Sequence, residues 1–136
     1  MSADDSEKPI GVVYTGGTFG MVETDRGLSP STDLPARVEA GLGHRGADDR
    51  PALVWLDHGW PALASCDVTP PLWYDLAASI RASRDDCRGF VVIHGTDTLA
   101  YTASALSFLL AGLDRPVVVT GASTPLGQEG SDALTN

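Results

Sequence analysis

Two segments of this 136-residue chain place hydroxyl and carboxylate side chains directly after runs of apolar residues. Thr15–Thr18, with the sequence TGGT, follows the run 10–14, and His94–Thr98, with the sequence HGTDT, follows the run 89–93. A threonine hydroxyl attacks an amide carbonyl when a base takes its proton, and a carboxylate binds an ammonium group. In an open parallel sheet, ligands bind outside the carboxyl ends of the strands. The two segments therefore predict one site built from two strand ends.

Apolar runs that alternate with amphipathic stretches indicate an α/β fold. We expect strands at residues 10–14, 52–56, 90–93 and 117–119. We expect helices over 36–42, from Pro70 with Thr69 as its N-cap, and from Thr98 to a terminating Gly112. This alternation predicts an open parallel sheet with helices on both faces. Residues 43–50 form a polar break, and residues 16–35, which show no period, are expected to be a lid or a disordered connection.

Composition narrows the possible functions. The net charge is −9, from 18 acidic and 9 basic residues, which argues against nucleic-acid binding because phosphates need a basic face. Residues 1–7 are polar and acidic, so they predict neither a signal peptide nor a membrane span. Cys66 and Cys87 lack metal or redox spacing and fit a reducing cytoplasm. His44, His58 and His94 lack ligand spacing, so no metal is expected.

Taken together, the TGGT and HGTDT segments resemble the bacterial L-asparaginase family. Flanking matches at Phe19–Met21, Tyr101–Phe108 and Ser131–Ala133 look like its cytoplasmic, type I branch. The resemblance runs from about Val12 to Asn136. It implies an N-terminal asparaginase domain, Rossmann- or flavodoxin-like in fold. The implied reaction hydrolyses L-asparagine to L-aspartate and ammonia through an acyl-threonine intermediate, without a cofactor.

The resemblance implies the catalytic roles. Thr18 is the implied nucleophile, and Gly17 before it lets the backbone turn sharply and a ligand come close. Thr96 is implied to activate the attacking group or water. Asp97 is implied to pair with a lysine and to hold the amino group of the substrate, which a carboxylate suits.

The resemblance also implies the remaining substrate contacts. Ser65 and Cys66 lie in the segment that aligns with the loop for the substrate α-carboxylate, and a serine hydroxyl with nearby backbone amides suits an anion. Gly121 and Ala122 follow the last expected strand and so line the same edge. The backbone carbonyl at this point, assigned to Ala122, is implied to meet the substrate amide.

Each of these residues also has a purely structural interpretation. Thr18 could be a turn threonine that hydrogen-bonds locally. Thr96 and Asp97 are both good helix caps. We expect His94, at the end of a buried strand, to be packed and hydrogen-bonded rather than a general base, and Asp132 to have a structural role at a helix start.

Two departures from the family pattern stand out. The family's lid carries a tyrosine that helps activate the first threonine, and Leu28 occupies the matching position. Leucine cannot transfer a proton, and Tyr14, within the first strand, is not an obvious substitute. The family also needs a lysine beside Thr96 and Asp97. Lys8 is the only lysine, and at roughly 3.3 Å per residue it lies on the order of 30 Å from Thr18.

The resemblance predicts a flexible tail at residues 1–9 and a domain at 10–136 that stops before a second domain. It implies a small-molecule substrate, no membrane association and a homodimer or homotetramer. Two alternatives remain open. One is an inactive module that binds amino acids or mediates oligomerisation. The other is the asparaginase-like subunit of a tRNA-dependent amidotransferase. Preference for asparagine over glutamine is not predicted.

Overall fold

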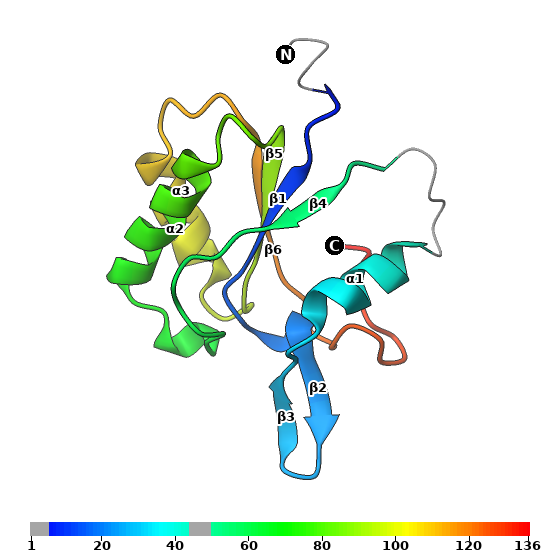
Figure 1. The fold of residues 1–136 in the computed structure, drawn as a ribbon. Coiled ribbons are helices and arrows are strands. Elements are labelled where there is room, and N and C mark those ends of the chain that lie inside the picture. Colours follow the sequence, from blue (N-terminus) through cyan, green and yellow to red (C-terminus); the bar gives the residue numbers. More distant parts are fainter. Residues whose placement is uncertain (1–5, 44–49) are drawn as a thin grey trace.

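The computed structural model describes residues 6–43 and 50–136 (Figure 1). Residues 1–5 of the expected tail, residues 44–49 of the expected polar break, and with them His44, lie outside the described residues. One sheet contains β1 (Ile10–Tyr14), β4 (Leu53–Trp55), β5 (Gly89–Ile93) and β6 (Val117–Thr120). Its strands are all parallel, in the order β4-β1-β5-β6, which confirms the predicted parallel sheet.

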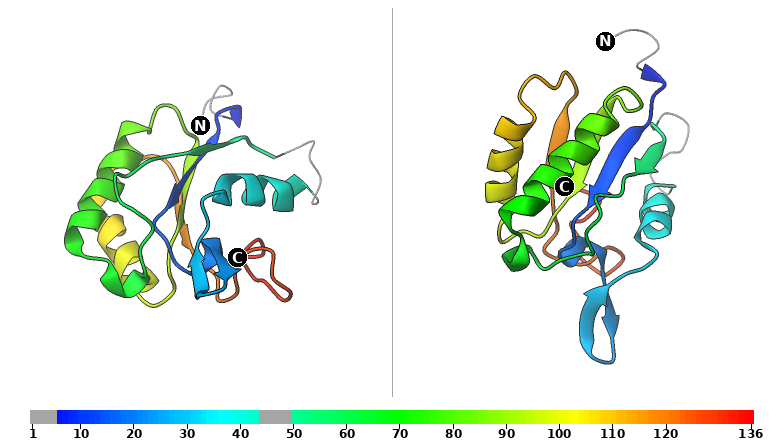
Figure 2. Two further views of the ribbon diagram at one scale, coloured as in Figure 1. Left: turned by 60° about the horizontal axis from the view of Figure 1, so that its bottom comes forward. Right: turned by 60° about the vertical axis from the view of Figure 1, so that its left-hand side comes forward.

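Helices cover both faces of the sheet, also as predicted. α2 (Pro70–Ala82) and α3 (Leu99–Leu109) pack together on one face, and α1 (Leu34–Gly43) lies on the other (Figure 2). Successive strand residues point to opposite faces, so neighbours such as Val12 and Val13 enter different cores. The core under α2 and α3 contains Val13, Leu72, Leu76, Ala77, Ile80, Cys87, Phe90, Val92, Leu106 and Leu110. The core under α1 contains Val12, Phe19, Leu34, Val38, Ile93, Ala122, Leu126 and Ala133.

Packing rather than capping holds α2 in place. Pro70 begins the helix and Thr69 is its N-cap residue, as predicted, but the Thr69 side chain makes no capping hydrogen bond. Leu72, Leu76 and Ile80 repeat every fourth residue, and all three are 0% exposed. Burial of each such side chain contributes about 1.5–3 kcal/mol, which exceeds the typical ~1 kcal/mol of an N-cap.

Of the two expectations for residues 16–35, a lid or a disordered connection, the disordered connection is wrong because the segment folds into regular structure. A 3-10 turn, η2 (Thr18–Gly20), leads into an antiparallel hairpin of β2 (Met21–Thr24) and β3 (Gly27–Pro30). Gly27 supplies a φ of 99° at the hairpin turn, where the Thr24 hydroxyl donates to its carbonyl at 2.6 Å. The hairpin extends away from the sheet (Figure 1) and is mostly exposed, so no apolar alternation marked it in the sequence.

Helix boundaries also differ from the predicted ones. α1 begins two residues before the expected 36–42, at Leu34, whose side chain packs into the core on that face. α3 ends at Leu109 rather than at Gly112. Gly112 adopts the left-handed φ of 81° in the turn that follows the helix, so its role in reversing the chain is as expected but lies slightly beyond the helix.

Candidate active site

The TGGT and HGTDT segments meet between β1 and β5, where the connections of the sheet change direction. β1 and β5 are adjacent, with Tyr14 paired to Ile93 at their carboxyl ends. From β1 the chain passes α1 and then joins β4, whereas from β5 it passes α3, on the opposite face, and then joins β6. The connections thus leave in opposite directions, and in this architecture such a switch point at the strand ends forms the crevice where ligands usually bind.

Glycines allow the segments to approach closely inside this crevice. Gly17 adopts a φ of 84°, and a Cβ atom there would lie 2.6 Å from the Gly95 amide nitrogen. A Cβ atom on Gly95 would lie 2.6 Å from Ser65 Cβ. Side chains other than hydrogen would therefore separate these segments, so the glycines are required for the close approach.

The loop that carries Ser65 is tied to β1 and to the turn after β5. Leu63 continues the pairing of β1, because its amide donates to Thr15 O at 2.8 Å and its carbonyl accepts from the Gly17 amide at 3.1 Å. Ser65 is 5% exposed. Its hydroxyl donates to Asp97 Oδ2 at 3.3 Å, and its carbonyl accepts from the Thr98 hydroxyl at 2.7 Å. Ser65 therefore links two of the implied substrate-binding segments.

Thr96 and Asp97 do not cap α3. The N-cap residue is Thr98, which makes no side-chain capping bond, and Thr96 and Asp97 lie exposed in the turn before it. Within the described residues, neither the Thr18 nor the Thr96 hydroxyl has a hydrogen-bond partner. The capping and local-turn explanations therefore do not account for these three side chains.

The remaining implied site residues are placed less directly. Thr18 begins η2 and is half-buried, and among the described residues it forms no hydrogen bond with Thr96 or Asp97. Cys66 is exposed beside Ser65. Ala122 is 2% exposed with its side chain in the α1 core, so only its backbone is suited to meet a ligand. Gly121 brings β6 to the same edge, since a Cβ there would lie 3.3 Å from Thr96 Cγ2.

His94 is packed and hydrogen-bonded, as expected. It is 0% exposed, and its ring nitrogens lie 2.8 Å from Gly95 O and 2.9 Å from Thr102 Oγ1. Burial lowers the pKa of His94, against the opposing effect of the Gly95 hydrogen bond. Both ring nitrogens are engaged, so neither is left to accept a proton from Thr18, and the contacts point to a structural or positioning role.

Tyr14 contacts the segment that carries Thr18. Its hydroxyl donates to Gly17 O at 3.2 Å, and burial raises its pKa, against a lowering effect of Arg37. A phenol that is donating its proton and has a raised pKa is a weak candidate for a base. The sequence offered no signal for this contact, because a tyrosine at a strand end is ordinary core composition.

Asp132 has a structural role, but not at a helix start. Its carboxylate accepts the amides of Ser123 and Thr124 at 3.1–3.2 Å and the Asn136 side chain at 2.9 Å. These bonds, those from Thr124 and Ser123 first, lower the pKa of Asp132. The residues after Asp132 form a turn, so the carboxylate secures the loop that follows β6 instead of opening a helix.

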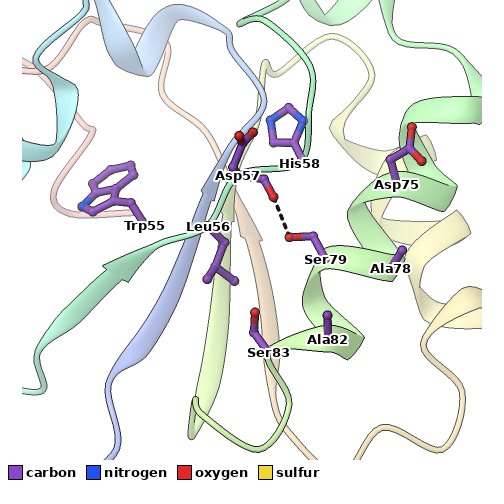
Figure 3. Close-up of a pocket in the computed structure, with 9 residues that line it drawn as sticks. All are labelled: Trp55, Leu56, Asp57, His58, Asp75, Ala78, Ser79, Ala82 and Ser83. Atoms are coloured by element: carbon purple, nitrogen blue, oxygen red, sulfur yellow. Dashed lines mark hydrogen bonds between the residues drawn. The ribbon is translucent and has the colours of Figure 1, made fainter.

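A solvent-open groove lies away from this crevice. It is an open groove of about 550 Å³ between the end of β4 and α2 (Figure 3). Its lining residues are Trp55, Leu56, Asp57, His58, Asp75, Ala78, Ser79, Ala82 and Ser83. Ser79 closes part of it by donating to Asp57 O at 3.0 Å. None of the implied site residues lines this groove.

The two departures from the family pattern persist in three dimensions. Leu28 lies on β3 and is 49% exposed. Lys8 precedes β1, whereas Thr18 follows it, so the strand separates them.

Among residues 6–43 and 50–136, no group of three or more His, Cys, Asp or Glu side chains is arranged to hold a metal ion. In the same residues, no helix is long and apolar enough to cross a membrane.

Comparisons with known proteins match nearly the whole chain. A family model described as "Asparaginase, N-terminal" covers residues 9–136. L-asparaginase 1 of Escherichia coli (strain K12) is 42% identical over 130 residues, which are 96% of this chain and 38% of that protein. The crystal structure of L-asparaginase I from Vibrio cholerae superposes with a TM-score of 0.84 at 38% identity, covering 96% of this chain and 38% of that one.

A shorter match bears on the amidotransferase alternative. A glutamyl-tRNA(Gln) amidotransferase subunit from Methanopyrus kandleri is 42% identical over 76 residues, which cover 54% of this chain and 17% of that protein. The asparaginases match a much larger share of the chain, although it spans only 38% of their length. From the family model and the structural superposition, the chain belongs to the asparaginase family, to whose N-terminal domain residues 9–136 correspond.

Proposed function

We propose that this chain carries the nucleophile-bearing part of an L-asparaginase site. Thr18 attacks the side-chain amide of L-asparagine, ammonia leaves, and water releases L-aspartate from the acyl-threonine. Thr96 assists the attacking group or water, and Asp97 binds the α-ammonium group. Ser65 and Cys66 contribute to the site of the α-carboxylate, and the backbone at Ala122 contacts the substrate amide.

One observation carries this proposal. Gly17, Ser65 and Gly95 pack together at the crevice between β1 and β5, and they bring the segments of Thr18, Thr96 and Asp97 to one edge of the sheet. The hydroxyls of Thr18 and Thr96 have no partner in the described part of the chain. Hydroxyls and a carboxylate on segments that meet at one sheet edge suit an amide substrate that carries an ammonium group.

Activation of Thr18 is the least complete step. Leu28 on β3 cannot accept a proton, and the Tyr14 hydroxyl is engaged with Gly17 O. The proposal therefore places the base for Thr18 outside these two side chains. Loss of a general base costs roughly 10²–10⁴-fold in rate, so low turnover is compatible with an intact binding site.

A second candidate function rests on the position of Lys8. It is the only lysine of the sequence and lies before β1, on the far side of the strand from Thr18. Within this chain, no lysine can therefore join Thr96 and Asp97. The chain by itself would then bind a small amino acid without hydrolysing it, and a native protein that supplies the lysine would complete the reaction.

The test is ammonia release from L-asparagine by the native protein that contains this chain. We expect turnover, and we expect Thr18→Ala to lower kcat by more than about 10³-fold. Thr69→Ala is the matched control, because Thr69 is exposed and makes no capping bond. L-aspartate binding to the isolated chain, measured by NMR, separates the two candidates. Binding without turnover favours the binding module. The absence of both activity and binding would refute both candidates.

The same assay tests the remaining alternative. Ammonia that is released only in the presence of a charged tRNA and a partner subunit would identify an amidotransferase subunit instead.

The proposal also includes a reducing, cytoplasmic location, since Cys66 and Cys87 are both free thiols. It includes assembly as a homodimer or homotetramer. Native mass measurement tests the oligomeric state, and a monomeric active protein would contradict it.

A further inference from the structure

His94 connects three elements that meet beneath the candidate site. Its Nε2 lies 2.9 Å from the Thr102 hydroxyl on α3, and its Nδ1 lies 2.8 Å from Gly95 O at the end of β5. The Trp73 indole N–H, on α2, donates to the same Thr102 hydroxyl at 2.9 Å. His94 and Thr102 are both 0% exposed. This buried chain of hydrogen bonds is not used by any catalytic step proposed above.

The chemistry of the partners fixes the direction of every bond in the chain. A carbonyl oxygen only accepts, so Nδ1 carries the proton that is donated to Gly95 O. The indole N–H of Trp73 only donates, so the Thr102 oxygen accepts from it. The Thr102 hydroxyl proton is then available for Nε2, which accepts in the neutral ring. Donation thus runs from Trp73 to Thr102, from Thr102 to His94 and from His94 to Gly95, and both ring nitrogens are used.

Gly95 is the last residue before the turn at residues 96–98, and it has little room to move. It lies between Gly17 and Ser65: a Cβ atom on Gly95 would lie 2.6 Å from Ser65 Cβ and 3.3 Å from Gly17 Cα. The bond from His94 Nδ1 holds the Gly95 carbonyl inward. Because the peptide unit is planar, fixing this carbonyl also fixes the plane of the amide that leads into Thr96 and hence the start of the turn to Asp97.

We propose that His94 is a positioning residue, and that its ring, held by Thr102 and Trp73, sets the Gly95–Thr96 peptide and thereby the orientation of Thr96 and Asp97. The effect on catalysis rests on the proposed function, whereas the effect of His94 on the Gly95–Thr96 peptide does not depend on it. It differs from a simple packing role, in which only the volume and burial of the ring would matter.

Two substitutions of His94 separate positioning from packing. In His94→Asn, the side-chain amide nitrogen replaces Nδ1 and can still donate to Gly95 O. In His94→Gln, the amide reaches toward Thr102 and fills the volume better, but no donor remains at the Nδ1 position. Positioning predicts that Asn retains more activity than Gln, whereas packing predicts the opposite order. A misplaced catalytic group can lower the rate on the order of 10²-fold. We therefore expect kcat/KM to fall by about that factor in His94→Gln and by less than about 10-fold in His94→Asn.

The matched control is His58→Gln. His58 is a partly buried histidine whose Nε2 lies 2.9 Å from Tyr14 O, and a glutamine can still donate there. We expect its kcat/KM to stay close to that of the wild type. A loss in this variant as large as in His94→Gln would overturn the assignment, because the effect would then belong to any histidine substitution near β1.

A second measurement needs neither activity nor a His94 variant. Nitrogen-15 NMR of the His94 ring in the wild-type chain reports which ring nitrogen carries the proton. We expect Nδ1 to be protonated and Nε2 to be bare. We expect Thr102→Val to disturb this state and to shift the backbone amides of Thr96 and Asp97, and we expect Thr102→Ser, which keeps the hydroxyl, to leave both near the wild type.

The outcomes of these experiments are distinct. A bare Nδ1, equal effects of Val and Ser at Thr102, or a Gln variant at least as active as Asn would each overturn the positioning role. If the wild-type protein releases no ammonia, the proposed function fails, yet the ring protonation and the amide shifts of Thr96 and Asp97 still decide the positioning role.

Discussion

The closest test of the crevice is Gly95→Ala. A Cβ atom on Gly95 would lie 2.6 Å from Ser65 Cβ and 2.8 Å from Ser65 Oγ. The first distance is about 0.8 Å short of the 3.4 Å at which ordinary contact begins. Gly95 is not among the glycines with a positive φ, so alanine adds this overlap without backbone strain. The substitution therefore measures packing between the two segments and little else.

We expect Gly95→Ala to cost about 1–3 kcal/mol in the free energy of unfolding, the usual range for overpacking a close-packed site. Ser65 has little freedom to yield, because it is 5% exposed, donates to Asp97 and accepts from Thr98. Gly43→Ala is the matched control. It lies at the end of α1 with nothing within 4 Å of the added Cβ, and alanine in a helix gains about 0.5–1 kcal/mol over glycine.

A double-mutant cycle makes the argument refutable. Ser65→Gly removes both atoms that the new Cβ would meet, and the next neighbour is Gly17 Cα at 3.3 Å. In that background we expect the cost of Gly95→Ala to fall by at least about 1 kcal/mol, within the range known for residues in contact. The assay is urea unfolding followed by circular dichroism. Additive effects within about 0.5 kcal/mol, or a Gly95→Ala variant as stable as Gly43→Ala, would refute the close approach.

Two further predictions concern the hairpin and the loop after β6. Leu28→Tyr places a phenol on β3, and we expect it to raise the turnover of the native protein, with an upper range of roughly 10²–10⁴-fold; an unchanged rate of ammonia release would mean that a different base serves Thr18. The pKa of Asp132 is lowered by the Thr124 and Ser123 amides, so the unfolded state binds more protons at acid pH and stability falls as pH drops below the unfolded value of about 3.9. We expect Asp132→Asn to flatten this acid dependence in urea unfolding between pH 3 and pH 6, and an unaltered slope would contradict the assignment.

The parallel sheet was predictable because each of its strands is a short, almost wholly apolar run. α2 was predictable for a related reason, since Leu72, Leu76 and Ile80 fall on one face at helical spacing. The hairpin of β2 and β3 was not predictable. Its strands are exposed, and its pairing is stabilised by backbone bonds and the Thr24–Gly27 contact rather than by an apolar face.

The site was predictable only in part. The rule that ligands bind at the carboxyl ends of parallel strands placed TGGT and HGTDT at one edge. The contact of Ser65 with Asp97 joins residues 32 positions apart, and no local pattern encodes such a pair. The bond between Trp73 and Thr102, 29 positions apart, is hidden for the same reason. Sequence periodicity identifies which residues are buried, but not which buried polar groups find one another.

The burial of the site residues separates two kinds of role and leads to a last prediction. Gly17, Ser65 and Gly95 are buried and make the close contacts, whereas Thr96 is exposed and its hydroxyl has no partner in the described residues. Exposed substitutions that remove no contact usually change stability by no more than about 0.5 kcal/mol. We therefore expect Thr96→Ala to leave the free energy of unfolding within that margin while ammonia release is largely lost, and Ser65→Ala to lower both. Urea unfolding and the ammonia assay on the same preparations measure the two effects. A destabilised Thr96→Ala would show that the side chain supports the fold, and a stable, fully active one would remove Thr96 from the proposed mechanism.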